Sequence, residues 1–376
     1  MYRFTNTETR SAMTETYDLA IVGGGIMGCS TALRVAEYGM KTIVLDQGDL
    51  GQGASGVNAG TLSLQIKRVQ LMPYALKGHS EWEAMGEAVG FKKTGGFTLA
   101  FTEHEAELLY ERQALKADAG APITFVSNNA LRAAEQHLSH KVLAASYCPE
   151  DGYANSSLTG QYYRLRLKEN DVQFREKCNV KLITRNSSGF NLTTSCGTVH
   201  ATRLLLAAGA WLKPIAAHLG VDLPISARVN TVSVTERMPP LISSIVGHAT
   251  GLLTMKQKSN GTILIGGGWQ GQGVPQDGRG NVIAKTLIPN LSLAQHVLPE
   301  LSNARVTRSW VGFEANVPDF YPLAGALPGI ENAFVLGCVR GGYTIGPYMG
   351  RLMGDYILGQ EPELPLFDPG REFSEV

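Results

Sequence analysis

YDLAIVGGGIMGCSTALRVAEYGMKTIVLD, residues 17–46, is the stretch that decides the fold. Its short apolar run 17–22 predicts a buried parallel strand, and a glycine turn follows at once. Residues 29–38 predict a helix that ends at Gly39, and residues 41–46 predict a second buried strand. Strand, glycine turn, helix and strand within about 30 residues form a βαβ unit, which indicates a parallel sheet.

The glycines of this turn occupy the positions of the dinucleotide fingerprint. Gly23 permits the tight turn, Gly25 lets the backbone approach a pyrophosphate, and Gly28 lets the helix pack closely on the strand. Ile26 and Met27 begin the helix, whose N-terminus offers free N–H groups and the positive end of a dipole. Asp46 ends the second strand, where an acidic side chain accepts hydrogen bonds from an adenosine ribose and disfavours NADP. The turn alone does not decide whether the cofactor is FAD or NAD.

Length, charge and cysteine usage limit the classes of protein to which the chain could belong. A chain of 376 residues fits two domains, or one large domain with an insertion. Lysine plus arginine equals aspartate plus glutamate at 33 each, so no overall field attracts nucleic acid. The five cysteines include no Cys-x-x-Cys pair, so neither a zinc site nor an iron–sulfur site is expected, and reduced thiols in a cytoplasm are expected. We see no signal peptide in residues 1–15 and no apolar run long enough to span a membrane.

Beyond the first unit, the pattern changes in the middle of the chain and changes back at its end. Helices are expected at 76–90, 103–120, 158–169 and 293–298. Strands are expected at 96–101, 173–182, 189–194, 198–206, 228–235, 251–256 and 262–265, with more antiparallel character in the middle. The βαβ character returns near the end of the chain, where we expect a strand at 333–336, a glycine-rich turn at 337–347 and a helix at 348–358.

The loop after Asp46 then favours FAD. Residues 51–62, GQGASGVNAGTL, resemble the second flavin-contacting loop of the D-amino acid oxidase family, which includes glycine oxidase and sarcosine oxidase. Further segments in family order are similar to its later motifs: 151–152 with the following helix, 206–211, 310–312, 318–319, 322–325 and 337–347.

This resemblance implies the α/β (α+β) class: a discontinuous Rossmann-like FAD-binding domain with an inserted mixed or antiparallel substrate domain. We expect the FAD-binding domain at 16–80, 141–215 and 305–376, the substrate domain at 81–140 and 216–304, and a flexible N-terminus at 1–15. Neither a cysteine near the late active-site segment nor a histidine in a recognised flavin loop is available for attachment, so FAD is expected to be non-covalent. The expected cofactor contacts are Gly23, Gly25, Ile26, Met27, Gly28, Asp46, Gln47, Ser55, Asn58, Ala59, Gly60, Thr61, Leu62, Val180, Ala208, Gly209, Trp211, Arg340, Gly341, Gly342, Tyr343 and Thr344.

Within the family, the chain looks most like the catalytic β-type subunits of multisubunit opine, hydroxyproline and hydrogen-cyanide-forming dehydrogenases. The resemblance implies dehydrogenation of the C–N bond of an amino acid or opine-like substrate by hydride transfer to flavin N5. It also implies redox partner subunits, and FMN or iron–sulfur centres are expected only with those subunits. Two alternatives stay open, a self-sufficient oxidase that uses oxygen and a non-catalytic flavoprotein scaffold.

Substrate recognition departs from the family pattern. The family's carboxylate-binding arginine commonly falls in a Gly-x-Arg-Pro segment, but residues 312–315 read GFEA and place Glu314 there. Arg340 is therefore expected to bind the substrate carboxylate, because its guanidinium binds both oxygens at once. For Glu314 three roles remain: pairing with Arg340, binding a cationic substrate group, or facing solvent. The other expected pocket residues are Gln65, Trp269, Tyr343 and Lys256, with Lys258 as an alternative lysine above the flavin.

Overall fold

The predicted βαβ unit is present and forms the centre of a parallel sheet. In the computed structural model, which describes residues 15–337 and 340–374, β1 (Glu15–Val22) lies between β2 (Thr42–Leu45) and β12 (Gly197–Leu206) and is parallel to both. Leu19, Ala20 and Ile21 are fully buried, because both faces of the sheet are covered. The helices α1 (Ile26–Ala36) and α9 (Gly342–Ile357) cover one face, and α7 (Leu212–Ala217) packs on the other.

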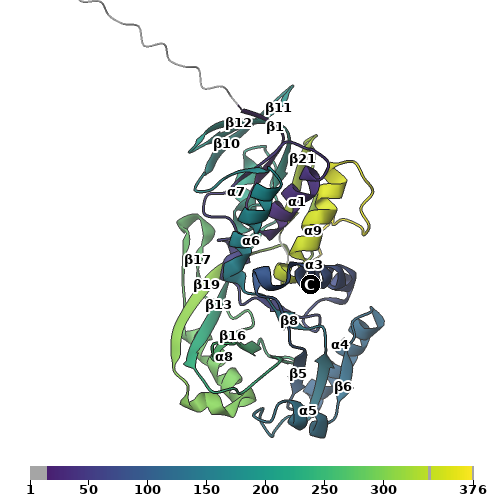
Figure 1. Ribbon diagram of the computed structural model, residues 1–376, viewed down its shortest axis with the longest axis vertical. Helices are drawn as coiled ribbons and strands as arrows, with labels where there is room; N and C mark the ends of the chain where they lie inside the picture. The colour runs from purple at the N-terminus through teal and green to yellow at the C-terminus, as the bar shows by residue number, and fades with distance from the viewer. Residues whose placement is uncertain (1–14, 338–339, 375–376) are drawn as a thin grey trace, which may run out of the picture.

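The other strands extend this sheet on both sides. It continues from β2 through a parallel strand and from β12 through one parallel strand and an antiparallel hairpin (Figure 1). These strands are β9 (Gln173–Arg175), β10 (Val180–Asn186), β11 (Gly189–Thr194), β20 (Leu323–Ala326) and β21 (Ala333–Gly337). Because β1, β2, β12 and β21 are parallel, their carboxyl ends meet at one edge, which is where ligands bind in such sheets.

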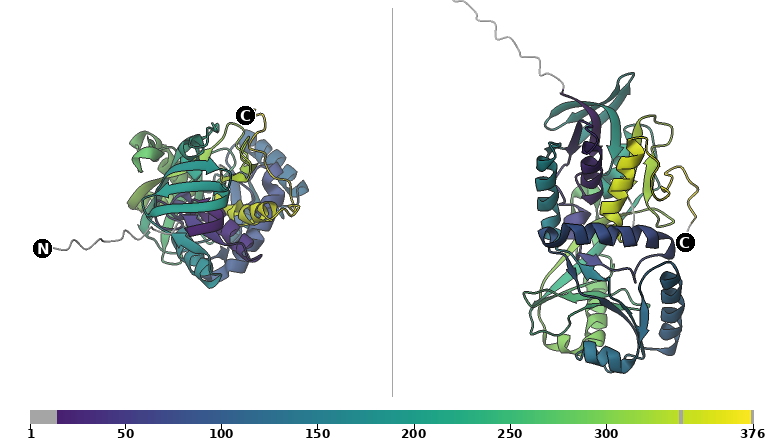
Figure 2. Two further views of the ribbon diagram at one scale, coloured as in Figure 1. Left: turned by 90° about the horizontal axis from the view of Figure 1, so that it is seen from above. Right: turned by 45° about the vertical axis from the view of Figure 1, so that its right-hand side comes forward.

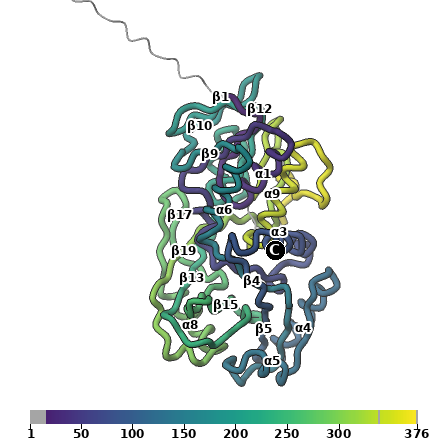
Figure 3. Tube along the Cα trace, in the orientation of Figure 1, coloured from purple at the N-terminus to yellow at the C-terminus, as the bar shows by residue number. Residues whose placement is uncertain are grey.

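A second sheet of eight strands lies beyond that edge (Figure 1). Its strands come from two stretches of the chain, residues 96–148 and residues 226–316, which can be followed in Figure 3. In sheet order its strands are β19 (Val306–Asn316), β13 (Ser226–Arg237), β16 (Thr262–Gly266), β15 (Thr254–Gln257), β14 (Ile245–His248), β5 (Gly96–Ala100), β7 (Ala144–Cys148) and β6 (Thr124–Val126). Its helices are α4 (Glu103–Asp118), α5 (Asn128–Ala134) and α8 (Ala284–Val297).

Two strands of the second sheet fall inside ranges that the sequence assigned to the FAD-binding domain. β7 pairs with β5 and β19 pairs with β13, so both are hydrogen-bonded into the second sheet. The segment of β19 was not predicted as a strand, because Arg308, Ser309 and Gly312 interrupt its apolar pattern. The predicted domain boundaries remain a proposal, and sheet membership favours moving those at 141 and 305 toward the C-terminus.

Short elements and one long helix connect the two sheets. The helix α3 (Met72–Met85) crosses between them, as the right-hand view of Figure 2 shows. The helix α6 (Ser156–Glu169) packs on α1 and on the short helix α2 (Ala54–Val57). The remaining strands form two small antiparallel sheets: β3 (Thr61–Leu62), β4 (Lys92–Lys93) and β8 (Gly152–Tyr153) in one, and β17 (Gln272–Val274) and β18 (Arg279–Asn281) in the other.

The glycine-rich segment 337–347 differs from its prediction as a turn. The helix α9 already begins at Gly342 and includes Pro347, whose ring nitrogen offers no hydrogen to the carbonyl of Tyr343 four residues earlier. Trp82 of α3 supplies the missing donor, with its Nε1 at 3.0 Å from that carbonyl oxygen. A proline is therefore tolerated here because another helix satisfies the free carbonyl, and a pattern along the chain does not reveal that contact.

The contact between α1 and α9 depends on glycines spaced four apart in α9. A side chain at Gly350 would place its Cβ 2.6 Å from the carbonyl oxygen of Met27, and one at Gly354 would meet Arg34 at a similar distance. The hydroxyl of Thr31 donates to the carbonyl oxygen of Gly350 at 2.9 Å. The first helix of the βαβ unit is therefore held by backbone contact with the last helix of the chain.

We predict that Gly350→Ala destabilises the protein. The added methyl group would overlap a backbone oxygen that cannot rotate away, and such overpacking costs about 1–3 kcal/mol. Denaturant unfolding should show this loss in the free energy of unfolding. The matched control Arg351→Ala, on the exposed side of the same turn, should change it by less than about 1 kcal/mol. Equal effects of the two substitutions would contradict tight packing at Gly350.

Candidate active site

One large cavity lies between the carboxyl ends of the first sheet and the second sheet. Its volume is about 1470 Å³. The first sheet contributes the glycine turn, residues 45–48 and residues 207–211, and the second sheet contributes residues from β13 and β19. The loop 52–59 and residues 340–343 complete the wall. Segments that lie far apart in the sequence therefore meet around one space at the edge expected for a ligand.

The glycine turn has the form that a pyrophosphate requires. Gly23 has a φ of +115°, and a Cβ there would lie 2.3 Å from the carbonyl oxygen of Ala207. A Cβ at Gly28 would lie 2.1 Å from the carbonyl oxygen of Gly23, so the predicted close packing of helix and strand is present. Gly25 precedes α1 without a capping side chain of its own, and Ser55 accepts a hydrogen bond from the N–H of Ile26 at 3.0 Å. The helix N-terminus thus faces the cavity and fits the phosphates of a dinucleotide.

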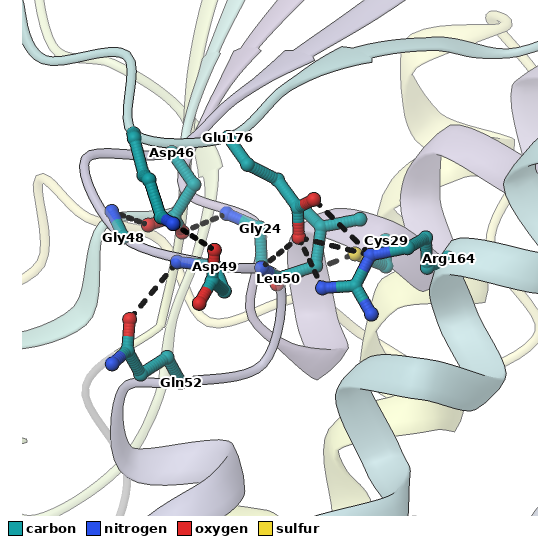
Figure 4. Close-up of polar contacts among 10 residues, drawn as sticks. Gly24, Cys29, Asp46, Gly48, Asp49, Leu50, Gln52, Arg164 and Glu176 are labelled. Carbon is teal, nitrogen blue, oxygen red and sulfur yellow. Dashed lines mark hydrogen bonds and ion pairs between the residues drawn. The ribbon is translucent and has the colours of Figure 1, made fainter.

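Asp46 connects this turn to the loop that follows β2 (Figure 4). One carboxylate oxygen accepts from the N–H of Gly24 and the other from that of Gly48, both at 2.7 Å. Burial raises the pKa of Asp46, and the two backbone N–H groups act against that shift. Asp46 lines the cavity, and its contact with a ribose remains a prediction.

A second carboxylate supports the same loop from the α6 side. Glu176 accepts from the N–H of Leu50 at 2.7 Å and from Nε of Arg164 at 3.1 Å (Figure 4). The hydrogen bonds and charge of Arg164, with the N–H of Leu50, keep the pKa of Glu176 low although burial opposes them. No pattern along the chain signals this pair, because its members belong to different elements.

The loop expected to contact the flavin is held mainly by its own side chains. Asn58 donates to the carbonyl oxygens of Ala54 and Ser55 and accepts from the N–H of Gly60 at 2.6 Å. A Cβ on Gly60 would lie 2.1 Å from the carbonyl oxygen of Ala154, so only glycine fits there. Trp310 of β19 donates to the carbonyl oxygen of Val57 at 2.7 Å, which fixes the loop against the second sheet.

Most of the expected cofactor contacts line the cavity, and some do not. Eighteen of the twenty-two positions do so: Gly23, Gly25, Ile26, Met27, Asp46, Gln47, Ser55, Asn58, Ala59, Thr61, Val180, Ala208, Gly209, Trp211, Arg340, Gly341, Gly342 and Tyr343. The other four lie behind the wall, where they pack or shape the loops: Gly28, Gly60, Leu62 and Thr344.

Three of the expected substrate contacts have other partners. Gln65 is buried, donates to the carbonyl oxygen of Gly96 at 2.8 Å and accepts from Ser146. Lys256 is also buried, and its Nζ lies 2.6 Å from the Thr61 hydroxyl. Trp269 donates to the carbonyl oxygen of Leu252. None of the three is among the residues that line the cavity in the part of the chain described by the structure.

Tyr343, Glu314 and Arg340 do line the cavity. Tyr343 packs at a tilt against Trp82 with ring centroids 4.5 Å apart, and its hydroxyl lies 3.0 Å from that of Thr159. Glu314 accepts from Asn230 at 2.7 Å and from the N–H of Gly341 at 3.0 Å. Its carboxylate thus holds the residue that follows Arg340, and no ion pair joins it to Arg340 among the described residues.

The guanidinium of Arg340 faces the cavity without a hydrogen-bond acceptor among the described residues. A side chain at Gly268 would lie 3.4 Å from its Nη2, so that glycine leaves room for the guanidinium. Burial and then the nearby Arg228 lower the pKa of Arg340, whereas Glu314 raises it. Its donors are therefore available to an anion.

Two further cations at the cavity were missed from the sequence. Lys67 is buried and donates from Nζ to the carbonyl oxygen of Gly341 at 2.7 Å. Arg68 donates to the carbonyl oxygen of Asp319 at 2.9 Å and lies over the ring of Phe320. Adjacent charged residues directly after the flavin-contacting loop were the available signal.

Three chemical features of the described residues bear on the cofactor. No group of histidine, cysteine, aspartate and glutamate there is arranged to hold a metal ion. His248 and Cys178 line the cavity, although neither lies in a recognised flavin loop. Cys338 lies outside the described residues. No described helix is long and apolar enough to cross a membrane.

Comparison with known proteins agrees with this geometry. The family model described as FAD dependent oxidoreductase matches residues 18–356. The chain belongs to this family of FAD-dependent oxidoreductases. The resemblance drawn from the flavin-contacting loop is thereby confirmed.

Individual members of the family of FAD-dependent oxidoreductases match the chain over nearly its whole length. Glycine oxidase of Geobacillus kaustophilus is 28% identical over 368 residues, covering 94% of this chain and 96% of the relative. The B subunit of opine oxidase from Rhizobium meliloti is 28% identical over 339 residues, covering 86% and 89%. The crystal structure of the Geobacillus glycine oxidase superimposes with a TM-score of 0.86 at 26% identity, covering 96% of this chain and all of that chain.

We predict that carboxylate binding depends on the protonation of Lys67. Burial lowers the pKa of Lys67 to about 8, while Glu314 and Asp151 act in the opposite direction and His79 on α3 lies nearby. An anion binds the protonated form better, so its affinity should fall as pH rises above about 8, by up to about tenfold per unit. Titration with an unreactive carboxylate that lacks an amine should show this slope. Lys67→Met should abolish it, and an unchanged slope in that variant would contradict the assignment.

Proposed function

We propose that this chain is an FAD-dependent dehydrogenase that oxidises the carbon–nitrogen bond of an amino acid or of an N-substituted, opine-like amino acid. The observation that carries the proposal is the free guanidinium of Arg340, which faces the same cavity as the glycine turn. A guanidinium binds both oxygens of a carboxylate, which fixes the α-carbon beside it. The glycine oxidase and opine oxidase relatives support this substrate class.

The chain's own residues bind and orient, and FAD supplies the hydride acceptor, its N5 atom. The glycine turn and the start of α1 would hold the pyrophosphate, and Asp46 positions that turn. Tyr343 and most residues of the loop 53–61 line the cavity in which the substrate would be held. The substrate amine must be neutral before its α-carbon releases hydride, and the imine product then hydrolyses.

Electrons are proposed to leave through partner subunits rather than directly to oxygen. The support is the match to two opine oxidase B subunits, whose names describe parts of a larger enzyme. FMN or iron–sulfur centres would then belong to those partners. The match to glycine oxidase favours a second candidate, a self-sufficient oxidase that forms hydrogen peroxide.

The first test concerns the cofactor and the reaction together. The purified chain should be yellow, acid precipitation should release FAD, and an anaerobic panel of amino acids and opines should bleach the flavin. Flavin retained on the precipitate would contradict non-covalent binding. If no amine in the panel bleached the flavin, the chain would instead be a non-catalytic scaffold. Rapid peroxide formation by the isolated chain would favour the oxidase over the dehydrogenase.

The second test concerns Arg340. Hydrogen bonds to charged groups contribute about 1.5–3 kcal/mol, so Arg340→Ala should lower kcat/KM for every carboxylate substrate by roughly ten- to hundredfold. Arg308→Ala is the matched control, because Arg308 lines the same cavity but lies over the ring of Trp310. Similar losses in both variants would show that cavity charge in general, and not Arg340, binds the carboxylate.

A further inference from the structure

We propose that Cys178 and Cys196 form a reversible disulfide that ties down one part of the cavity wall and slows the release of FAD. Hydrogen peroxide is the oxidant, and a dithiol is the reductant. The two residues are called the cysteine pair below. This inference needs the FAD site of the family but not the proposed reaction, so either one can fail without the other.

The cysteine pair stands where the ladder between β10 and β11 ends. The antiparallel register of these strands continues one residue beyond both of them, where the N–H of Ser195 donates to the carbonyl oxygen of Asn179 at 2.9 Å. The next step of the register sets Cys178 opposite Cys196. Residues that face each other in such a ladder have Cα atoms roughly 4.5–5.5 Å apart, which lies within the range of about 4.4–6.8 Å that a disulfide spans.

The contacts of the two side chains agree with this register. Sγ of Cys178 lies 3.2 Å from the hydroxyl oxygen of Thr194, and the N–H of Cys196 donates to the same oxygen at 2.9 Å. Sγ of Cys196 lies 3.9 Å from the carbonyl oxygen of Lys177, in the peptide bond that precedes Cys178. The two thiols also interact with each other by a hydrogen bond. Both sulfurs therefore lie at one place, where a bond can join them.

The two thiols differ in the way that disulfide formation requires. Cys196 is exposed, whereas Cys178 is buried. Hydrogen bonds with Cys178 and then with Ser195 lower the pKa of Cys196, and the positive charge of Arg175 acts in the same direction. Burial raises the pKa of Cys178. Cys196 is therefore the thiol that meets an oxidant, and Cys178 is the neighbour that captures the oxidised sulfur.

The oxidation of the cysteine pair proceeds in two steps. The thiolate of Cys196 attacks one oxygen of hydrogen peroxide, the O–O bond breaks, and a sulfenic acid and a hydroxide form. The thiol of Cys178 then attacks that sulfur, and the S–S bond forms while the hydroxyl group leaves. With the two thiol protons, the two leaving groups become two molecules of water. Two electrons pass from the sulfurs to the peroxide, and a dithiol later returns two electrons to the disulfide.

The disulfide acts on the cofactor site because residues 178–180 line the cavity. The N–H of Cys178 donates to the carbonyl oxygen of Asp46 at 2.7 Å, and Asp46 accepts from the N–H of Gly24 in the glycine turn. Cys196 lies in the turn that joins β11 to β12, and β12 pairs with β1. The bond therefore ties this part of the wall to the central sheet. A binding segment that is fixed in advance loses less freedom when it holds its ligand, so FAD is held longer.

The first measurement asks whether the bond forms. The flavin-loaded protein is reduced with dithiothreitol, freed of it and treated with a small excess of hydrogen peroxide. Tryptic peptides should then show a link between Cys178 and Cys196, because cleavage at Lys181 and Arg185 separates the two cysteines. Dithiothreitol should remove the link. Oxidation of Cys196 to a sulfinic acid, or a link between two chains, with Cys178 left as a free thiol would overturn the proposal.

The second measurement is the rate at which FAD leaves the protein on dilution, followed by the fluorescence of the free flavin. Oxidation should slow this release roughly three- to tenfold, and dithiothreitol should restore the original rate. Cys196→Ser removes the exposed thiol, which lies outside the cavity, and Cys178→Ser removes its partner. Each variant is compared with itself before peroxide, and neither should respond.

Two outcomes of the second measurement would overturn the effect on the cofactor. One is an equal rate of release from the reduced protein and from the disulfide-linked protein. The other is the same slowing in Cys196→Ser, which would place the responsible oxidation elsewhere in the chain. Neither measurement requires turnover, so a flavin that no amine bleaches would refute the proposed function and leave the cysteine pair standing.

Discussion

Backbone contact at glycines is the constraint on which the rest of the structure depends. Gly28 brings α1 against the carbonyl of Gly23, and Gly350 brings α9 against the carbonyl of Met27. These contacts aim the uncapped start of α1 at the cavity. They also set the position of α9, whose first residues form the cavity wall next to Arg340. The candidate cofactor site and the candidate substrate site therefore share one packed pair of helices.

The sequence predicts those parts of the fold that depend on interactions between residues close together in the chain. Residues 17–46 form the expected strand, turn, helix and strand, because burial and turn chemistry act there within a few residues. The strand β19 was missed because it lines a cavity and carries Arg308, Gly312 and Glu314 among apolar residues. The start of α9 was missed because its tolerance of Pro347 comes from Trp82, which is remote in the sequence.

The candidate site shows the same limit. The loops expected to hold the cofactor are each a contiguous motif, and most of their residues line the cavity. Gln65 and Lys256 were expected at the wall but bind partners behind it, since the direction of a side chain reverses with each residue along an extended chain. Arg228 and Lys67 were not found, because their relation to Glu314 and Gly341 arises only when the two sheets are assembled.

The contact between α1 and α9 also has a consequence for how the protein is made. Thr31 and Gly350 are hydrogen-bonded although they are 319 residues apart in the sequence. In the same way, one edge of β1 pairs with β12, which is synthesised much later. All residues from 31 to 350 must therefore be synthesised before the contact between α1 and α9 can form. Until then the apolar face of α1 lacks its partner, and non-local contacts of this kind slow folding and expose surface to aggregation.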